Sequence, residues 1–337
     1  MREEYELEVL EQYDLEVKST RKIRGAFFCD TDEGPVLLRE TGMSEQRALF
    51  LYQVLNCLET DGNIKTDTPV HTKSGELTAA APDGRRYMLK KWHYGRECDV
   101  RQESEAVQAA RQLAVLHAGL SGEKVREIAA DASAPVSPAR DPLEEIRRHN
   151  RELKKVRRFI RGRAVKNEFE YLFLESFEKM YRTAEQTAAR MEESGIPAFF
   201  RESVRGGQLL HGEYNYHNLL TDGDGIAVTN FEHMKTGIQV YDLYYFIRKV
   251  MEKYSWKLKT GQKLLEAYED VRPLTQPERE YAGLMLAYPE KYWKTASGYY
   301  HSNKAWMPEK NREKLRLVLR QCEGKKEFLD QIFSIDI

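Results

Sequence analysis

The most informative part of this sequence is residues 208–220, which read Gln208-Leu-Leu-His-Gly-Glu-Tyr-Asn-Tyr-His-Asn-Leu-Leu220. Two leucine pairs, at 209–210 and 219–220, bracket a dense polar loop at 211–218. Functional groups concentrate on loops that rigid elements hold in place, and apolar anchors on both sides of a polar loop fit that pattern. The stretch therefore predicts a site rather than a plain turn.

A second strand-like run, Gly225-Ile-Ala-Val-Thr-Asn-Phe-Glu232, follows directly after the turn Asp222-Gly-Asp-Gly225. Turn residues between two apolar runs are typical of a β-hairpin. We expect this hairpin to bring Asn230 to the same place as the 211–218 loop.

The polar loop has the spacing His-x-Glu-x-x-x-x-Asn, from His211 through Glu213 to Asn218. The catalytic loop of kinases has this spacing, with a carboxylate base followed five residues later by an Asn that binds metal. A second metal-binding carboxylate should come from the next strand, where Asn230 stands in this chain. Because short motifs often match by chance, a polar hairpin that only satisfies its own backbone stays open as an alternative.

The rest of the chain divides into a β-type part and a helical part. The first ninety residues alternate short β-type runs with turns and hold one helix, which begins after Ser44 and runs to about Leu58. Beyond about residue 100 the apolar spacing is helical, with a long helix over about 167–193. We predict an α+β, bilobal fold with a cleft between the lobes. Its parts are a small β-rich N-lobe at 1–91, a connector at 92–98, and a mostly helical C-lobe at 99–337 that carries the hairpin at 208–232.

Composition excludes several classes of protein. The 337 residues include 53 Lys and Arg and 54 Asp and Glu, and this balance argues against a protein that coats nucleic acid with its whole surface. No run approaches the roughly 18 apolar residues of a membrane span, and the acidic first residues lack the apolar core of a secretory signal. The four cysteines form no CxxC pair, which favours reduced thiols and an intracellular protein.

Three stretches together resemble the CotS-type spore coat proteins of endospore-forming bacteria: HGEYNYHNLL at 211–220, VTNFEH at 228–233 and VYDLYYFIRKVMEKYSW at 240–256. These proteins resemble in turn the aminoglycoside phosphotransferase and choline kinase branch of the protein-kinase-like fold. The resemblance implies a kinase-like fold, synthesis in the mother-cell cytoplasm, incorporation in the spore coat, and other coat proteins as partners.

The resemblance also assigns roles to eight positions of this sequence. The catalytic positions are Glu213, in place of Asp, and His211, and the cofactor positions are Arg39 and Trp92. The metal positions are Asn218, Asn230 and Glu232. Asp242 is the Asp that braces the catalytic loop. For an active site of this kind the implied cofactors are ATP and Mg²⁺.

Several of these positions depart from the phosphotransferase pattern. Glu213 is one methylene longer than Asp, and a misplacement near 1 Å can cost roughly 10²-fold in rate. Asn230 removes a charge that would hold Mg²⁺, and Arg39 changes the shape of a cation that contacts phosphate. No Gly-rich run lies between Lys22 and Val36. We therefore predict a degenerate phosphotransferase site in a protein of coat assembly or structure, with an active ATP- and Mg²⁺-dependent kinase as the alternative.

The segment at 147–163, RRHNRELKKVRRFIRGR, holds nine basic residues and one acid, for a net charge of +8. Since the whole chain carries -1, the other residues sum to -9. The segment indicates either an anionic partner, with nucleic acid less favoured, or a solvated amphipathic helix.

Overall fold

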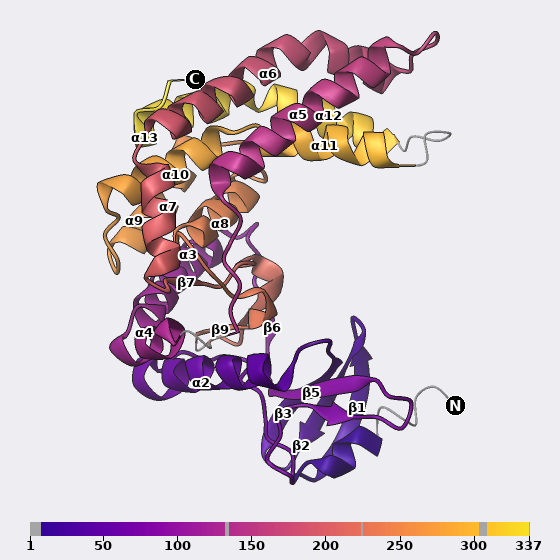
Figure 1. The fold of residues 1–337 in the computed structure, drawn as a ribbon, viewed down its shortest axis with the longest axis vertical. Helices are drawn as coiled ribbons and strands as arrows, with labels where there is room; N and C mark the ends of the chain where they lie inside the picture. The colour runs from indigo at the N-terminus through magenta and orange to yellow at the C-terminus, as the bar shows by residue number, and fades with distance from the viewer. Residues whose placement is uncertain (1–7, 132–134, 224, 303–308, 337) are drawn as a thin grey trace.

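The structure, a computed structural model, describes residues 8–131, 135–223, 225–302 and 309–336. Two unequal lobes lie along the longest axis of the molecule, with the β-rich N-lobe at the bottom of Figure 1 and the helical C-lobe above it. The predicted α+β class is confirmed. Within the described residues, no helix is both long enough and apolar enough to cross a membrane.

The N-lobe is built on one antiparallel sheet of five strands in the order β1-β2-β3-β5-β4. The elements of this lobe are η1 (Val9–Gln12), β1 (Val17–Ile23), β2 (Ala26–Thr31), β3 (Gly34–Glu40), α2 (Glu45–Gly62), β4 (Ala79–Ala80) and β5 (Arg86–Lys91). Apolar side chains of η1 and of the sheet pack into a small core of their own.

Helix α2 connects the lobes. The hydroxyl of Ser44 accepts a hydrogen bond from the backbone N–H of Arg47, which caps the first turn as the sequence predicts. The helix continues one turn past Leu58 because Asn63, in a left-handed conformation, is the residue that ends it. Its buried face joins the main core of the C-lobe, so α2 stays fixed to the lobe above the sheet.

The C-lobe begins with β6 (Arg96–Glu97) and contains eleven α-helices among the described residues. These helices are α3 (Glu103–Leu120), α4 (Glu123–Ala130), α5 (Pro142–Arg161), α6 (Glu168–Glu193), α7 (Ile196–Arg205), α8 (Tyr241–Met251), α9 (Leu258–Glu269), α10 (Gln276–Ala287), α11 (Glu290–His301), α12 (Glu309–Arg320) and α13 (Cys322–Phe333). Parts of α5, α6, α11 and α12 extend together to the right at the top of Figure 1, and we call them the arm. A separate aromatic core fills the arm, which shows that it is a packed unit.

The polar loop lies between two small ladders. β7 (Leu209–Leu210) pairs with β10 (Lys235–Thr236), while β8 (Leu219–Thr221) pairs with β9 (Ile226–Val228) and with β6. The sequence predicted one hairpin over 208–232, and this was wrong in detail because the first leucine pair bonds to a strand beyond that range. The short helices η2 (Tyr216–Asn218) and η3 (Phe231–His233) complete the region.

Asp242 anchors the start of the loop from α8. Its carboxylate is fully buried and accepts hydrogen bonds from the backbone N–H groups of His211 (2.7 Å) and Gly212 (2.9 Å). Gly212 has a φ of +83°, and a Cβ there would overlap the carbonyl oxygen of His233. The loop is therefore held by one carboxylate and by one position that only glycine fits.

His149 holds two helices of the arm together. Its ring stacks on the Trp293 indole with 3.3 Å between centroids and 16° between planes, so it links α5 to α11. The side chain is buried, and burial lowers the pKa of His149 to about 4.

We expect Asp242→Ala to lower the free energy of unfolding by about 3 kcal/mol, because two backbone N–H groups lose their buried acceptor. Urea denaturation measures this change. The control is Asp270→Ala, which removes an exposed ion pair with Arg111 and should cost less than about 1 kcal/mol. Equal losses in the two variants would contradict the anchoring role.

We also expect His149 to make stability depend on pH. Its folded-state pKa of about 4 lies below the ordinary 6.5, so the unfolded chain takes up a proton first as the pH falls. The His149 contribution to stability is thus complete above pH 6.5 and is lost toward pH 4. Between pH 7 and 5 this loss amounts to about 2 kcal/mol. Urea denaturation of His149→Gln at both pH values should show a smaller pH dependence by this amount, whereas the exposed His71→Gln should keep the wild-type dependence.

Candidate functional site

Two adjoining cavities lie between the lobes. The first, of about 510 Å³, is lined by the β3–α2 connection and by Glu213, Asn218, Asn230 and Glu232. The second, of about 370 Å³, lies between the sheet and lining residues at 92–97. Arg39, Asn218 and Asn230 line both cavities. The structure thus brings five of the eight predicted positions to one cavity, from segments almost 200 residues apart.

The carboxylate of Glu213 faces the larger cavity and is 43% exposed. The imidazole of His233 lies beside it, with Nε2 3.3 Å from Oε2. The carbonyl oxygen of Glu213 accepts from the side-chain amides of Asn215 and Asn218. These bonds fix the backbone of the loop while they leave the carboxylate free to reach into the cavity.

His211 does not reach either cavity. Its ring is fully buried, with Nε2 donating to the carbonyl of Thr229 (3.0 Å) and Nδ1 accepting from the N–H of Glu213. Burial lowers the pKa of His211, although Asp242 opposes the shift, so the ring is neutral. This geometry makes His211 a positioning residue for the loop, in contrast to the catalytic contact that the sequence suggested.

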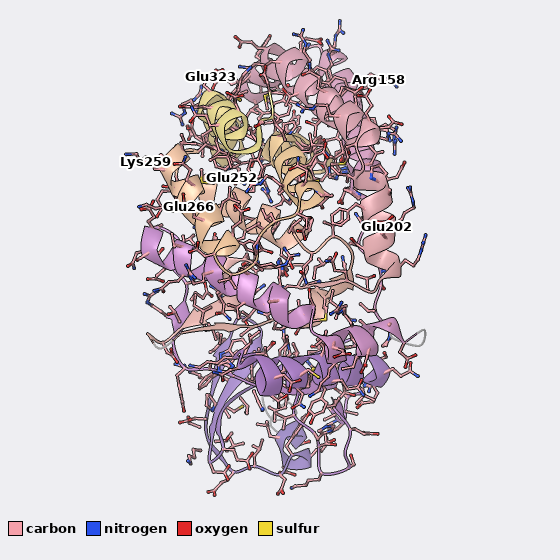
Figure 2. All side chains as sticks on the ribbon, turned by 90° about the vertical axis from the view of Figure 1, so that its left-hand side faces the viewer. Arg158, Glu202, Glu252, Lys259, Glu266 and Glu323 are labelled. Carbon is pink, nitrogen blue, oxygen red and sulfur yellow. The ribbon has the colours of Figure 1, made fainter. Side chains whose placement is uncertain are left out.

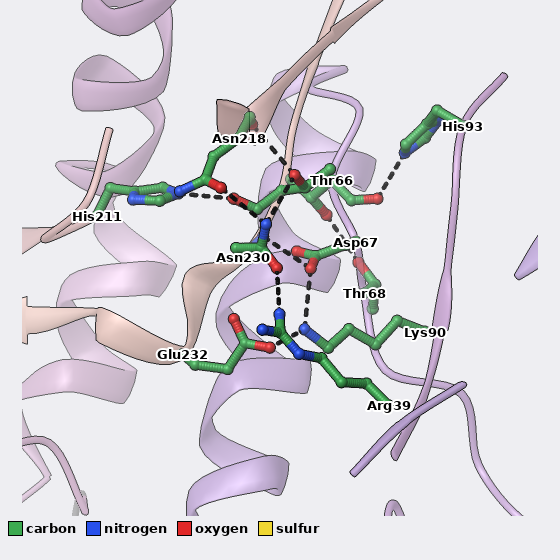
Figure 3. A network of polar contacts seen from close by, with 11 residues as sticks. Arg39, Thr66, Asp67, Thr68, Lys90, His93, His211, Asn218, Asn230 and Glu232 are labelled. Carbon is green, nitrogen blue, oxygen red and sulfur yellow. Dashed lines mark hydrogen bonds and ion pairs between the residues drawn. The ribbon is translucent and has the colours of Figure 1, made fainter. Parts of the chain in front are cut away.

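A directional chain of hydrogen bonds runs through the metal positions (Figure 3). Nη1 of Arg39 donates to Oδ1 of Asn230 (2.9 Å), Nδ2 of Asn230 donates to Oδ1 of Asn218 (2.8 Å), and Nδ2 of Asn218 donates to the carbonyl of Glu213 (2.9 Å). Because a guanidinium only donates, the oxygen of Asn230 must face Arg39 and its NH₂ must face Asn218. Every amide orientation in the chain is therefore determined.

These residues do not fit a Mg²⁺ ion. Magnesium needs oxygen ligands, with one or two carboxylates among them, but both amide oxygens already accept hydrogen bonds and the NH₂ of Asn230 points at Asn218. The nearby carboxylate of Glu232 forms an ion pair with Lys90. No group of three or more His, Cys, Asp or Glu side chains in the described parts of the chain is arranged to hold a metal.

Lys90 and Asp67 are the two residues of the site that the sequence did not reveal. Lys90, from β5, is almost completely buried and pairs with Asp67 (3.1 Å) and with Glu232 of the C-lobe. Oδ2 of Asp67 also accepts from the backbone N–H of Asn230 (2.8 Å), which supports the left-handed conformation of that residue. A lysine on the inward face of a predicted strand was the available signal, but its partners lie 23 and 142 residues away.

The electrostatics of this cluster follow from its burial. Burial raises the pKa of Asp67, and the nearby Glu232 adds to the shift, while the Lys90 ammonium opposes it. Burial alone would lower the pKa of Lys90, but the two carboxylates reverse this and raise it. Lys90 is therefore a permanent cation that holds Glu232 away from a metal.

The smaller cavity has a mixed apolar and charged lining. Ile23, Ala26, Phe28 and Leu37 of the sheet and Leu220 of β8 give it apolar walls. Trp92 packs against this apolar cluster at the start of the connector. Arg21, Arg24 and Arg39 line the same cavity, so it combines apolar surfaces with positive charge.

The fold is shared with solved phosphotransferase structures. An aminoglycoside phosphotransferase from Alicyclobacillus acidocaldarius matches with a TM-score of 0.84 and 18% identity, over 97% of this chain and 94% of that one. Spectinomycin phosphotransferase APH(9)-Ia in complex with ADP and its antibiotic matches with a TM-score of 0.63 and 11% identity, over 96% and 98% of the two chains. Amicoumacin kinase hAmiN, in complex with AMP-PNP, Ca²⁺ and its substrate, matches at 0.60 and 11%, over 98% and 94%. At these identities the matches establish a kinase-like fold, as predicted.

The sequence relatives establish the family. Spore coat protein S of Bacillus subtilis (strain 168) is 25% identical over 336 residues, which cover 96% of this chain and 93% of that protein. The model of the family described as "Spore coat putative kinase YutH" matches residues 6–332. The expected kinship with CotS-type proteins is thus confirmed, and the chain belongs to this family of kinase-like spore coat proteins.

Proposed function

We propose that this protein is a spore coat component that binds a nucleotide through its arginines and apolar walls, without a requirement for metal, and that it has lost most phosphotransferase activity. The observation that carries the proposal is the hydrogen bond from Nδ2 of Asn230 to Oδ1 of Asn218. Asn230 has an amide where a kinase site has a carboxylate. Its NH₂ group makes a hydrogen bond to the Asn218 oxygen that would bind the metal.

Two further features support the proposal that phosphoryl transfer at this site is weak. Catalysis of this reaction depends on positioning and on charge stabilisation rather than on covalent chemistry by the protein. Glu213 places its carboxylate one methylene farther along than Asp would, and Glu232 is neutralised by Lys90. The site thus keeps the backbone of a kinase loop, while one of its carboxylates is displaced by a methylene and another is paired with a buried lysine.

The nucleotide part of the proposal rests on the smaller cavity. Its apolar walls suit a base, and Arg39 is placed to meet a phosphate, whereas Arg24 forms an ion pair with Glu97 of the same cavity. Spectinomycin phosphotransferase and amicoumacin kinase, which have this fold, were crystallised with ADP and AMP-PNP. A nucleotide held in this way would serve as a structural ligand of a coat protein.

An active phosphotransferase is the second candidate, and one observation favours it. Glu213, Asn218, Asn230 and Glu232 all line one cavity that adjoins the base-sized one, which is the arrangement that catalysis needs. In that case ATP and Mg²⁺ would be the cofactors, and Glu213 would be the base.

The relationship to Spore coat protein S supports a place in the spore coat and a role in its assembly or structure. We propose that the protein is made in the mother-cell cytoplasm and that other coat proteins are its partners. The packed arm stands apart from the two cavities, so a partner protein that binds the arm would leave the cavities open.

We expect ATP to bind the purified protein with EDTA present, and Mg²⁺ to strengthen binding less than about threefold, or about 0.7 kcal/mol. Isothermal titration calorimetry with and without Mg²⁺ measures both quantities. Strictly Mg²⁺-dependent binding that Asn218→Ala abolishes would favour the active kinase instead. The absence of ATP binding in either condition would remove the nucleotide from the proposal.

We expect Asn230→Asp to create a dependence on metal, because a carboxylate cannot donate to Asn218 and leaves two oxygens facing one position. In the same titration, Mg²⁺ should strengthen ATP binding to this variant at least about tenfold, or about 1.4 kcal/mol. Asn56→Asp is the matched control, since Asn56 lies in α2 and lines neither cavity. A gain in the control, or none in Asn230→Asp, would contradict the assigned role of the amide.

A further inference from the structure

The strongest charged surface outside the site lies on α5 of the arm. Nine basic residues occur at 147–163, but acids from neighbouring segments neutralise four of them. Arg147 pairs with Glu192 and Glu144, Arg148 with Glu145, Arg157 with Glu178, and Arg163 with Glu170. The single acid of the segment, Glu152, is engaged by Trp293, Ser297 and His301.

The other five cations form one exposed stripe, which we call the α5 stripe. Its members are Arg151, Lys154, Lys155, Arg158 and Arg161. They fall within about 120° of the helix circumference and span about 15 Å along it. None of the five has an ion pair within the described residues, and Arg158 lies at the outer edge of the C-lobe in Figure 2.

The α5 stripe is unfavourable for an isolated chain. Arg151 and Lys155 are spaced i,i+4, as are Lys154 and Arg158, and like charges at this spacing repel. Lys154 lies over the ring of Tyr181 and is attracted by Glu185 of α6, but no contact within the described residues offsets the repulsion among the other four cations of the stripe. An acidic surface from another molecule would relieve it.

The chain itself carries such a surface on the N-lobe. Six exposed carboxylates lie along η1, the start of β1 and the β2–β3 turn, and we call them the acidic face: Glu8, Glu11, Asp14, Glu16, Asp32 and Glu33. The backbone N–H of Glu16 donates to Asp32, which ties the two segments together. The six make no ion pair among the described residues, although Lys18 attracts Asp32 and the Lys73 ammonium donates to the backbone carbonyl of Glu11.

One molecule cannot bring these two surfaces together. The N-lobe and the arm lie at opposite ends of the long axis in Figure 1. We propose that the α5 stripe of one copy docks on the acidic face of a second copy. The two surfaces differ, so the contact is head-to-tail and builds open chains of molecules unless the rotation closes a ring.

The balance of charge favours a second copy over nucleic acid. Outside 147–163 the chain carries a net charge of -9, which would repel a polyanion but attracts the stripe of another copy. Two exposed apolar side chains near the tip of the α5–α6 hairpin, Val165 (81%) and Tyr171 (62%), provide contact area of the kind that protein interfaces use.

Sedimentation velocity of the full chain tests the proposal. At about 20 mM salt the mean sedimentation coefficient should rise with protein concentration, and at about 300 mM the rise should disappear, because salt screens exposed charges over a few ångströms. Association that persists at high salt, or its absence at low salt, would overturn the proposal.

Charge reversal identifies the two surfaces. R151E/R158E should remain monomeric at low salt, and so should E11R/D14R, while an equimolar mixture of the two should form a heterodimer. The matched control is K259E, which reverses an exposed cation on α9 away from the arm and should associate like the wild type. Circular dichroism checks that each variant folds.

Failure of the mixture to associate would overturn the pairing of the two surfaces. If the protein does not self-associate but binds a short double-stranded DNA in a salt-sensitive way that R151E/R158E abolishes, the stripe would be assigned to nucleic acid.

Discussion

The hydrogen bonds made by Asn230 connect the two lobes and determine what the site between them can do. Arg39 reaches Asn230 from the N-lobe sheet, and Asp67 holds its backbone N–H, while Asn218 receives its amide from the C-lobe side. A carboxylate at this position would keep the contact to Arg39 but would lose the bond to Asn218. With an amide in place of a carboxylate, this position offers no negative charge to a cation. The Asn230 side chain instead accepts a hydrogen bond from Arg39 and donates one to Asn218.

The surrounding charges agree with this interpretation. Lys90 is buried between Asp67 and Glu232 and spans the lobes, so a carboxylate close to the metal position serves the fold. Breaking such a pair leaves a buried charge without a partner, which is strongly unfavourable. The buried Asp242 still orients the loop through its two backbone hydrogen bonds. The loop geometry depends on backbone anchors, whereas phosphoryl transfer in this fold would depend on a few charged side chains.

Sequence reasoning reached the bilobal architecture and the cavity that joins Glu213, Asn218 and Asn230, because apolar pairs and turn residues at fixed spacing determine that region locally. The pairing of β7 with β10 was not predicted, since β10 lies outside any hairpin that the sequence marks. The roles of Lys90 and Asp67 could not be predicted from the sequence, because they depend on contacts between distant segments. The charge of residues 147–163 was visible in the sequence, but the division into neutralised and unpaired cations depends on α6 and could only come from the structure.

We propose that the amide of Asn230 occupies the position where a kinase site holds its metal. A crystal structure of the protein grown with ATP and Mn²⁺, with anomalous data collected at the manganese edge, tests it directly. The account predicts no anomalous peak between Asn218 and Asn230, whose side-chain amides should stay within hydrogen-bond distance as they are at 2.8 Å here. A manganese ion bound by the oxygens of both residues, with the amide of Asn230 rotated away, would contradict it.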